Sequence, residues 1–306
     1  MKINKIFTGN SLEVLKTLPD NSIDCCITSP PYWGLRDYGH EEQLGSEKHF
    51  KDFVNNLCNV FDEVQRILKP TGTCFVNLGD TYNGSKQGND DTKNKNANTK
   101  TFKKEKTELP NKSLCMIPER FAIEMIDRGW VLRNQIIWHK PNQMPSSAKD
   151  RFTVDFEKIF FFVKQPKDYY FEQQLEPISE VSLKRSEYGW NGKVMETGKA
   201  AAGISPIEKM GSRFVNPDGR NMRTVWEINT EPNSEAHFAT YPQRLVERML
   251  KAGCPENGVV LDPFFGSGTT GVYARKVNRN YIGIELNPEY VEIAKNRLYK
   301  ELGMFS

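Results

Sequence analysis

Two short apolar runs, far apart in the chain, each end in a turn of unusual composition, and they constrain the fold more than any other feature. Ile23–Ile27 leads into Thr28–Trp33, and Gly258–Leu261 leads into Asp262–Thr270. Apolar runs of this length bounded by turn residues predict buried parallel strands. Because open α/β sheets bind ligands beyond the carboxyl ends of such strands, we expect the two turns to form the halves of one site.

The rest of the chain alternates between strand-like and helix-like patterns. Helices are expected at Ser11–Leu18 (capped by Asn10 or Ser11), Phe50–Leu68, Ile117–Asp127, Thr269–Lys276 and Pro288–Leu302, and Lys69–Gly72 should end the second of them. Further strands are expected at Lys5–Gly9, Thr73–Leu78, Trp130–His139, Ile159–Val163 and Tyr281–Glu285. This alternation predicts an α/β fold in which helices cover both faces of a mostly parallel sheet.

Length and composition narrow the function classes. The chain of 306 residues can bury a full core, and it shows neither an apolar run long enough to span a membrane nor a signal peptide, so we expect a cytoplasmic protein. Its six cysteines lack C-x-x-C spacing, which predicts free buried thiols and no metal site. The net charge of +3 is too small to indicate a nucleic-acid partner by itself.

Two segments break the α/β rhythm. Residues 83–112 carry eight lysines and four acids, which predicts a flexible loop. The loop is either simply solvated or acts as a mobile arm that contacts phosphates. Residues 165–233 interleave basic and aromatic side chains, which suits a nucleic-acid surface as well as an irregular insertion. The candidate DNA-binding residues in this second segment are Lys184, Arg185, Arg213, Arg220 and Arg223.

The glycine-rich turn fits two cofactors. Gly266–Gly271 matches G-x-G-x-x-G between a strand and a helix, and Glu285 ends the next strand, as in nicotinamide dinucleotide sites. The segment after Gly271 is too short for a second mononucleotide-binding half, and Asp262 beside the loop should repel a pyrophosphate. An acid there suits an ammonium instead. A ligand with ribose, adenine and an amino-acid ammonium, S-adenosylmethionine, therefore fits better.

The Ser29–Tyr32 turn suits transfer to an exocyclic amino group of a nucleobase, whose lone pair is delocalised into the ring. A hydroxyl oxygen and a main-chain carbonyl can accept its hydrogens and pull the nitrogen towards tetrahedral geometry. Pro30 and Pro31 hold that carbonyl rigidly and add no competing N–H. Tyr32 supplies a face on which an extruded base can stack.

Taken together, these motifs resemble the amino-group DNA methyltransferases of the permuted β class, in which the catalytic motif precedes the cofactor motif. The resemblance also covers Leu18–Asp24, Trp138–Asn142, His237–Pro242 and Ile284–Pro288. It implies the S-adenosylmethionine-dependent, Rossmann-like methyltransferase fold in circularly permuted form, with an inserted target-recognition region. It also implies base flipping and double-stranded DNA as the substrate.

The resemblance assigns roles residue by residue. It implies a catalytic tetrapeptide of Ser29, Pro30, Pro31 and Tyr32, and a cofactor loop of Asp262, Phe264, Gly266, Gly268 and Thr269. It makes Glu285 the ribose-binding acid and places Phe238, Thr240 and Pro242 around the methionine moiety. Family members often carry Gly-Asp where this chain has Gly9-Asn10, so Asn10 is a weaker cofactor candidate. Trp33–Tyr38, with Arg36 as a DNA contact, extends the catalytic motif as in relatives that methylate cytosine N4.

These residues predict three parts: a catalytic half over 1–164, a target-recognition region over 165–233 and a cofactor half over 234–306. Ser29 favours cytosine N4 as the methylated position, with adenine N6 as the alternative, and the absence of a Pro-Cys dipeptide argues against carbon-5 methylation. A nicotinamide-dependent oxidoreductase and a non-catalytic DNA-binding protein are more distant alternatives. The resemblance leaves room for a separate cognate restriction endonuclease and for a homodimer.

Overall fold

The computed structural model describes residues 2–34, 40, 42–84, 107–181, 218–231 and 241–303. The chain forms two compact units, Met1–Glu172 with Thr224–Ser306, and Gln173–Arg223. Within the described residues, no helix is both long and apolar enough to cross a membrane.

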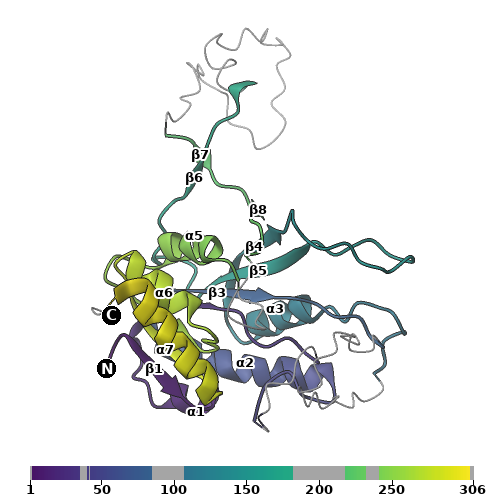
Figure 1. The fold of residues 1–306 in the computed structure, drawn as a ribbon, viewed down its shortest axis with the longest axis horizontal. Coiled ribbons are helices and arrows are strands. Elements are labelled where there is room, and N and C mark those ends of the chain that lie inside the picture. Colours follow the sequence, from purple (N-terminus) through teal and green to yellow (C-terminus); the bar gives the residue numbers. More distant parts are fainter. Residues whose placement is uncertain are drawn as a thin grey trace, which may run out of the picture. The chain divides into compact units, whose positions relative to one another are not determined.

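The first unit is built on one eight-stranded sheet, in the order β1-β10-β9-β2-β3-β5-β4-β8 (Figure 1). The strands are β1 Lys5–Thr8, β2 Ile23–Thr28, β3 Leu68–Leu78, β4 Val131–His139, β5 Phe156–Val163, β8 Val225–Glu227, β9 Val259–Asp262 and β10 Asn280–Glu285. All neighbouring strands run parallel except β5, which is antiparallel to both β3 and β4. The expected mostly parallel sheet is therefore confirmed.

Helices cover both faces of this sheet, as expected (Figure 1). They are α1 Ser11–Lys16, α2 Phe50–Ile67, α3 Ile117–Asp127, α5 Gln243–Gly253, α6 Thr269–Lys276 and α7 Pro288–Leu302. Successive side chains of a strand point to opposite faces. Cys74 and Val76 of β3 join the core cluster with α2 and α3, whereas Thr73 and Phe75 contact Gly253 of α5 on the other face.

The helix predicted to end at Lys69–Gly72 ends slightly earlier, and that segment belongs to a strand. Leu68 already has extended backbone angles and pairs with Ile23, and β3 continues from there to Leu78. The register between β2 and β3 shifts between Ile23 and Cys25, which absorbs the extra residues. Pro70 is tolerated because it lies at this irregularity, where its missing N–H breaks no regular ladder.

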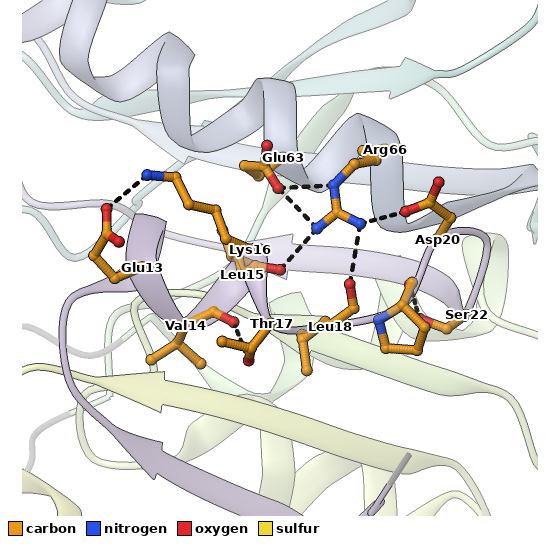
Figure 2. Close-up of polar contacts among 11 residues, drawn as sticks. Glu13, Val14, Leu15, Lys16, Thr17, Leu18, Asp20, Ser22, Glu63 and Arg66 are labelled. Carbon is orange, nitrogen blue, oxygen red and sulfur yellow. Dashed lines mark hydrogen bonds and ion pairs between the residues drawn. The ribbon is translucent and has the colours of Figure 1, made fainter.

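Arg66, near the end of α2, anchors the neighbouring helix α1 (Figure 2). Its guanidinium donates to the main-chain oxygens of Leu15 and Leu18 at 2.9 and 3.0 Å, and it pairs with Asp20 and Glu63. The Leu15 carbonyl also accepts from the Leu18 amide, so the arginine adds a second donor there and supplies the side-chain donor of the Leu18 carbonyl. It thereby fixes α1 against α2.

The second unit contains a two-stranded antiparallel pair, β6 Leu175–Glu176 and β7 Arg220–Asn221. Its remaining described residues are 173–174, 177–181, 218–219 and 222–223. The predicted recognition region, 165–233, contains this unit, and its role stays a prediction.

Candidate active site

A cavity of about 750 Å³ opens where β1, β10, β9 and β2 end. These are four neighbouring parallel strands, so the cavity lies at the sheet edge where α/β folds bind ligands. Residues predicted from the catalytic motif and from the cofactor motif both line it: Asn10, Ser29, Pro31, Phe264, Gly266, Thr269 and Glu285. The structure thus brings the two distant turns into one site.

A buried hydrogen bond joins the two turns directly. The Thr28 hydroxyl, at the end of β2, donates to Asp262 Oδ1, at the end of β9, across 2.6 Å. The same carboxylate accepts from the Thr270 hydroxyl at 2.6 Å, from the Tyr241 hydroxyl at 3.0 Å and from the Phe264 amide at 3.1 Å. Four donors therefore converge on one carboxylate.

Asp262 lies beneath the cavity, which changes how its role is understood. Its side chain is 1% exposed and is not among the residues that line the cavity. Burial raises the pKa of its carboxyl, and the four hydrogen bonds oppose that rise. The geometry makes it a tie between the catalytic turn and the cofactor loop, and direct cofactor contact stays a prediction.

Tyr241 is a site residue that sequence reasoning missed. It lies in the His237–Pro242 motif and lines the cavity, and its hydroxyl contacts both Asp262 and Thr270. Burial, with the nearby Asp262 carboxylate, raises the pKa of its phenol well above the ordinary value. Its neighbour Pro242 is buried and begins α5, whereas Phe238 and Thr240 lie outside the described residues.

Glycine is needed at different positions of the cofactor loop for different reasons. Gly266 and Gly268 have φ values of +51° and +81°, the left-handed region that a side chain rarely adopts. Gly271, the third glycine of the dinucleotide-like pattern, instead makes room for Phe265. A Cβ at Gly271 would lie 2.6 Å from the Phe265 ring. That third glycine is explained by packing and needs no pyrophosphate.

Glu285 reaches the cavity from the end of β10 and is tied to the glycine loop. Its Oε2 accepts from the Gly266 amide at 2.8 Å and its Oε1 from the Asn287 amide at 2.9 Å. Burial raises the pKa of the carboxyl, and these two main-chain donors counteract the rise. A carboxylate held in this way keeps further lone pairs for ligand hydroxyls.

Asn10 begins α1 as its cap. Its amide oxygen accepts from the Leu12 amide at 3.0 Å and the Glu13 amide at 3.4 Å. The expected cap is confirmed, and the oxygen that we expected to accept from a cofactor already has these partners. A cofactor contact by this residue stays a prediction.

Tyr32 lies outside the cavity lining and is held by two side chains, Asn77 and Glu157, and Glu157 in turn accepts from Lys140; none of the three was a predicted site residue. Its hydroxyl donates to Glu157 Oε2 at 2.6 Å and accepts from Asn77 Nδ2 at 3.0 Å. All lie at the same sheet edge as the cavity. The only sequence signal was their place near strand ends, which many polar residues share.

Two of the predicted DNA-binding residues fall in the described part of the second unit. Arg220 Nε and Arg223 Nε both contact Glu176 Oε1, at 2.9 and 2.6 Å. The carboxylate offsets part of their positive charge, which the sequence did not reveal. Arg36, Lys184, Arg185 and Arg213 lie outside the described residues.

Comparisons with known proteins agree with this geometry. The family model for N6/N4 DNA methylases matches residues 23–296. The type II methyltransferase M.Cfr9I of Citrobacter freundii is 42% identical over 298 residues, which cover 97% of this chain and 88% of that protein. M.SmaI of Serratia marcescens is 38% identical over 299 residues, covering 97% and 91%.

Solved structures show the same fold. The PvuII DNA methyltransferase, described as cytosine-N4-specific, matches with a TM-score of 0.60 and 22% identity over 97% of this chain and 86% of that one. The Thermus thermophilus protein TTHA0409, solved with S-adenosyl-L-methionine, matches with a TM-score of 0.60 and 22% identity over 98% and 97%. The expected methyltransferase fold is confirmed, and the chain belongs to the N6/N4 DNA methylase family.

Proposed function

We propose that this protein transfers a methyl group from S-adenosylmethionine to the exocyclic N4 of a cytosine flipped out of duplex DNA. The observation that carries the proposal is the shared cavity. Ser29 and Pro31 line it beside Phe264, Gly266 and Glu285, and the Thr28–Asp262 hydrogen bond holds the two turns together.

The cavity fits this cofactor. Its volume of about 750 Å³ lies in the range of pockets that hold ligands of this size. We assign to Glu285, which lines the cavity, the hydrogen bonds from the two ribose hydroxyls, and we expect the left-handed glycines to let the main chain approach the ligand closely. S-adenosylmethionine supplies a methyl group on a positively charged sulfur.

The residues of the catalytic turn orient the acceptor nitrogen. Ser29 Oγ and the Pro30 carbonyl accept the amino hydrogens, which draws the lone pair out of conjugation with the base. Asn77 Nδ2 lies 3.4 Å from Ser29 Oγ, and its N–H donates to that oxygen and orients the hydroxyl. Transfer between a sulfonium and an amine needs in-line placement more than strong acid or base help.

Adenine N6 is the second candidate for the methylated position. The chemistry at the two amino groups is nearly the same, and the family includes both specificities. Serine in the first position of the tetrapeptide favours cytosine, as does the Trp33–Tyr38 extension.

One experiment separates the candidates. The protein is expressed in a host that lacks the modification, the host DNA is digested, and the nucleosides are identified by mass spectrometry. We expect N4-methylcytosine, and methylome sequencing of the same DNA should place it in one sequence context. N6-methyladenine would overturn the base assignment alone, whereas unmodified DNA together with tight NAD binding would overturn the methyltransferase proposal.

The biological setting follows from the relatives. Proteins similar to this chain are named as type II methyltransferases, so we propose a restriction–modification role in the cytoplasm beside a separately acting endonuclease. We also propose that residues 165–233 recognise the target sequence. Light scattering of the purified protein tests whether it forms a homodimer.

A further inference from the structure

Three polar side chains meet beside the catalytic turn, at one edge of the sheet. Asn77 lies near the end of β3, Glu157 near the start of the antiparallel β5, and Lys140 directly after β4. Glu157 accepts from the Tyr32 hydroxyl at 2.6 Å, from Asn77 Nδ2 at 2.7 Å and from Lys140 Nζ at 2.5 Å. One carboxylate thus serves three donors from three different parts of the chain.

The ring of Tyr32 is fixed at two places, by Gly79 at its edge and by the cluster at its hydroxyl. Gly79, just after β3, lies so close that a Cβ there would be 2.6 Å from Tyr32 Cε2. The hydroxyl at the far end of the ring is held by Glu157 and Asn77. The orientation of the ring therefore depends on contacts at its edge and at its tip.

The same cluster also reaches Ser29. Asn77 Nδ2 lies 2.7 Å from Glu157 Oε2 and 3.4 Å from Ser29 Oγ. A change in the position of the Glu157 carboxylate would therefore move the Asn77 amide and, with it, the Ser29 hydroxyl. The Glu157 side chain is 17% exposed and Asn77 is 2% exposed. Charge-assisted hydrogen bonds in such a setting are short and directional.

We propose that Glu157 is the positioning residue of the catalytic tetrapeptide, acting through the Tyr32 hydroxyl and through Asn77. Its task is to hold the aromatic face and the Ser29 oxygen where the flipped base needs them. The inference rests on the proposed methyl transfer to an extruded base. Glu157 is assigned no proton transfer and no contact with the cofactor.

The substitution Glu157→Gln tests this role sharply. An ionised carboxylate only accepts hydrogen bonds, whereas an amide has one acceptor oxygen and one donor nitrogen. Glutamine keeps the size of the side chain but must turn its amide nitrogen either towards Lys140, which contacts Oε1, or towards Tyr32 and Asn77, which contact Oε2. Glu157→Ala, which removes both acceptor oxygens, is therefore measured beside it. A misplacement of reacting groups by about 1 Å can cost on the order of 100-fold in rate.

We expect Glu157→Gln to slow the single-turnover rate of methyl transfer by about 10- to 100-fold at saturating cofactor and DNA. The affinity for S-adenosylmethionine should stay within about twofold of wild type, because Glu157 lies outside the cavity lining. The DNA carries the recognition sequence found in the modified host genome. A 2-aminopurine at the target position should also show altered quenching in the variant complex, because its stacking partner has moved.

A double-mutant cycle with Tyr32→Phe separates positioning from general damage. If Glu157 acts through the Tyr32 hydroxyl, the double variant should be at least about fivefold faster than the product of the single effects. Rate losses that simply multiply would overturn the proposal, as would wild-type rates in both Glu157→Gln and Glu157→Ala.

Glu119→Gln is the matched control. Glu119 is a half-buried carboxylate that pairs with Lys158, the residue after Glu157 on β5, and it does not belong to the cluster that holds Tyr32. An equal rate loss in this variant would show that any lost ion pair suffices, which contradicts a specific role. Wild-type protein that transfers no methyl group would instead defeat the proposed function, and N6-methyladenine as product would leave the coupling measurable on adenine.

Discussion

Glu285 combines a structural contact and a predicted ligand contact on one side chain. Its oxygens accept from the Gly266 and Asn287 amides, and they face the cavity. We predict that Glu285→Ala weakens binding of S-adenosylmethionine, because two charge-assisted hydrogen bonds to the ribose are lost at about 1.5–3 kcal/mol each before relaxation. Calorimetric titration should show at least a roughly tenfold higher Kd.

Glu289→Ala is the control for that titration, since this acid is exposed in the first turn of α7 and does not line the cavity. Unchanged affinity in Glu285→Ala would contradict the assignment of the ribose site.

The same carboxyl should give binding a pH dependence. Burial raises the pKa of Glu285, and the ribose hydroxyls need its ionised form as an acceptor. Cofactor affinity should therefore fall as the pH drops through this raised pKa. Stability runs the other way, since a carboxyl with a raised folded pKa favours the native state below its unfolded value of about 4.3 and loses that contribution as pH rises.

Urea titrations at a series of pH values check this second effect. The stability of wild type minus that of Glu285→Gln should decline from about pH 4 upward. A difference that grows with pH would show that the carboxyl is stabilised in its ionised form.

At the scale of elements, the contacts of Arg66 on α2 with α1 should contribute measurably to the free energy of unfolding. Arg66→Met keeps most of the side-chain volume but removes the guanidinium donor from the Leu18 carbonyl and leaves the Leu15 carbonyl with its main-chain donors alone. We expect a loss of about 1–3 kcal/mol in the free energy of unfolding, measured by denaturant titration. Lys16→Met, which breaks an exposed pair with Glu13, should cost no more than about 0.5 kcal/mol.

Cofactor affinity should weaken as well in Arg66→Met, because Asn10 and Ser11 at the start of α1 line the cavity. Equal stability of the two variants would show that water replaces the guanidinium at no cost.

The β6–β7 pair offers a test of DNA contact. We predict that the double variant Arg220→Ala/Arg223→Ala weakens DNA binding and flattens its salt dependence by roughly one unit of slope per lost phosphate contact. Glu176→Gln should do the opposite, because it removes the carboxylate that both arginines contact. Fluorescence anisotropy over a salt series measures both slopes.

The proposed DNA contact is contradicted if the double variant and Glu176→Gln bind the cognate duplex as wild type does. Cofactor affinity serves as the control, since these residues do not line the cavity.

At the scale of the whole molecule, all six cysteines are free and buried, as the sequence predicted. Burial raises the pKa of Cys58 and of Cys254 to about 12, and it raises the pKa of Cys25 and Cys26 as well. We therefore expect no thiol of the native protein to react with Ellman's reagent at pH 8 within minutes. Six should react in denaturant, and rapid labelling without denaturant would indicate an opened core.

The sequence predicted an element well where residues within and next to that element determine its bounds. Ile117–Asp127, Thr269–Lys276 and Pro288–Leu302 were predicted with their observed bounds, because apolar spacing and flanking glycine, proline or cap residues agree there. α5 was missed although Leu245, Val246, Met249 and Leu250 follow helical spacing.

Site residues that belong to a short sequence motif were predictable. Residues whose role depends on contacts between distant segments were not. Ser29, Gly266 and Glu285 follow from short patterns, and all three line the cavity. Glu157 and Arg66 became visible only in three dimensions, because their partners are fixed by strand order and helix packing.

The bond between Thr28 and Asp262 spans 234 positions of the chain, and β1 pairs with β10. The ribosome therefore exposes the edge of β2 long before β9 is made to cover it, and β1 has no neighbouring strand until β10 is made. The nascent protein passes through a period when its first half carries an unpaired parallel edge and an unfinished cofactor pocket. Chains arrested before Asp262 should need chaperones for solubility, and they lack the residues at the ends of β9 and β10 that complete the cavity.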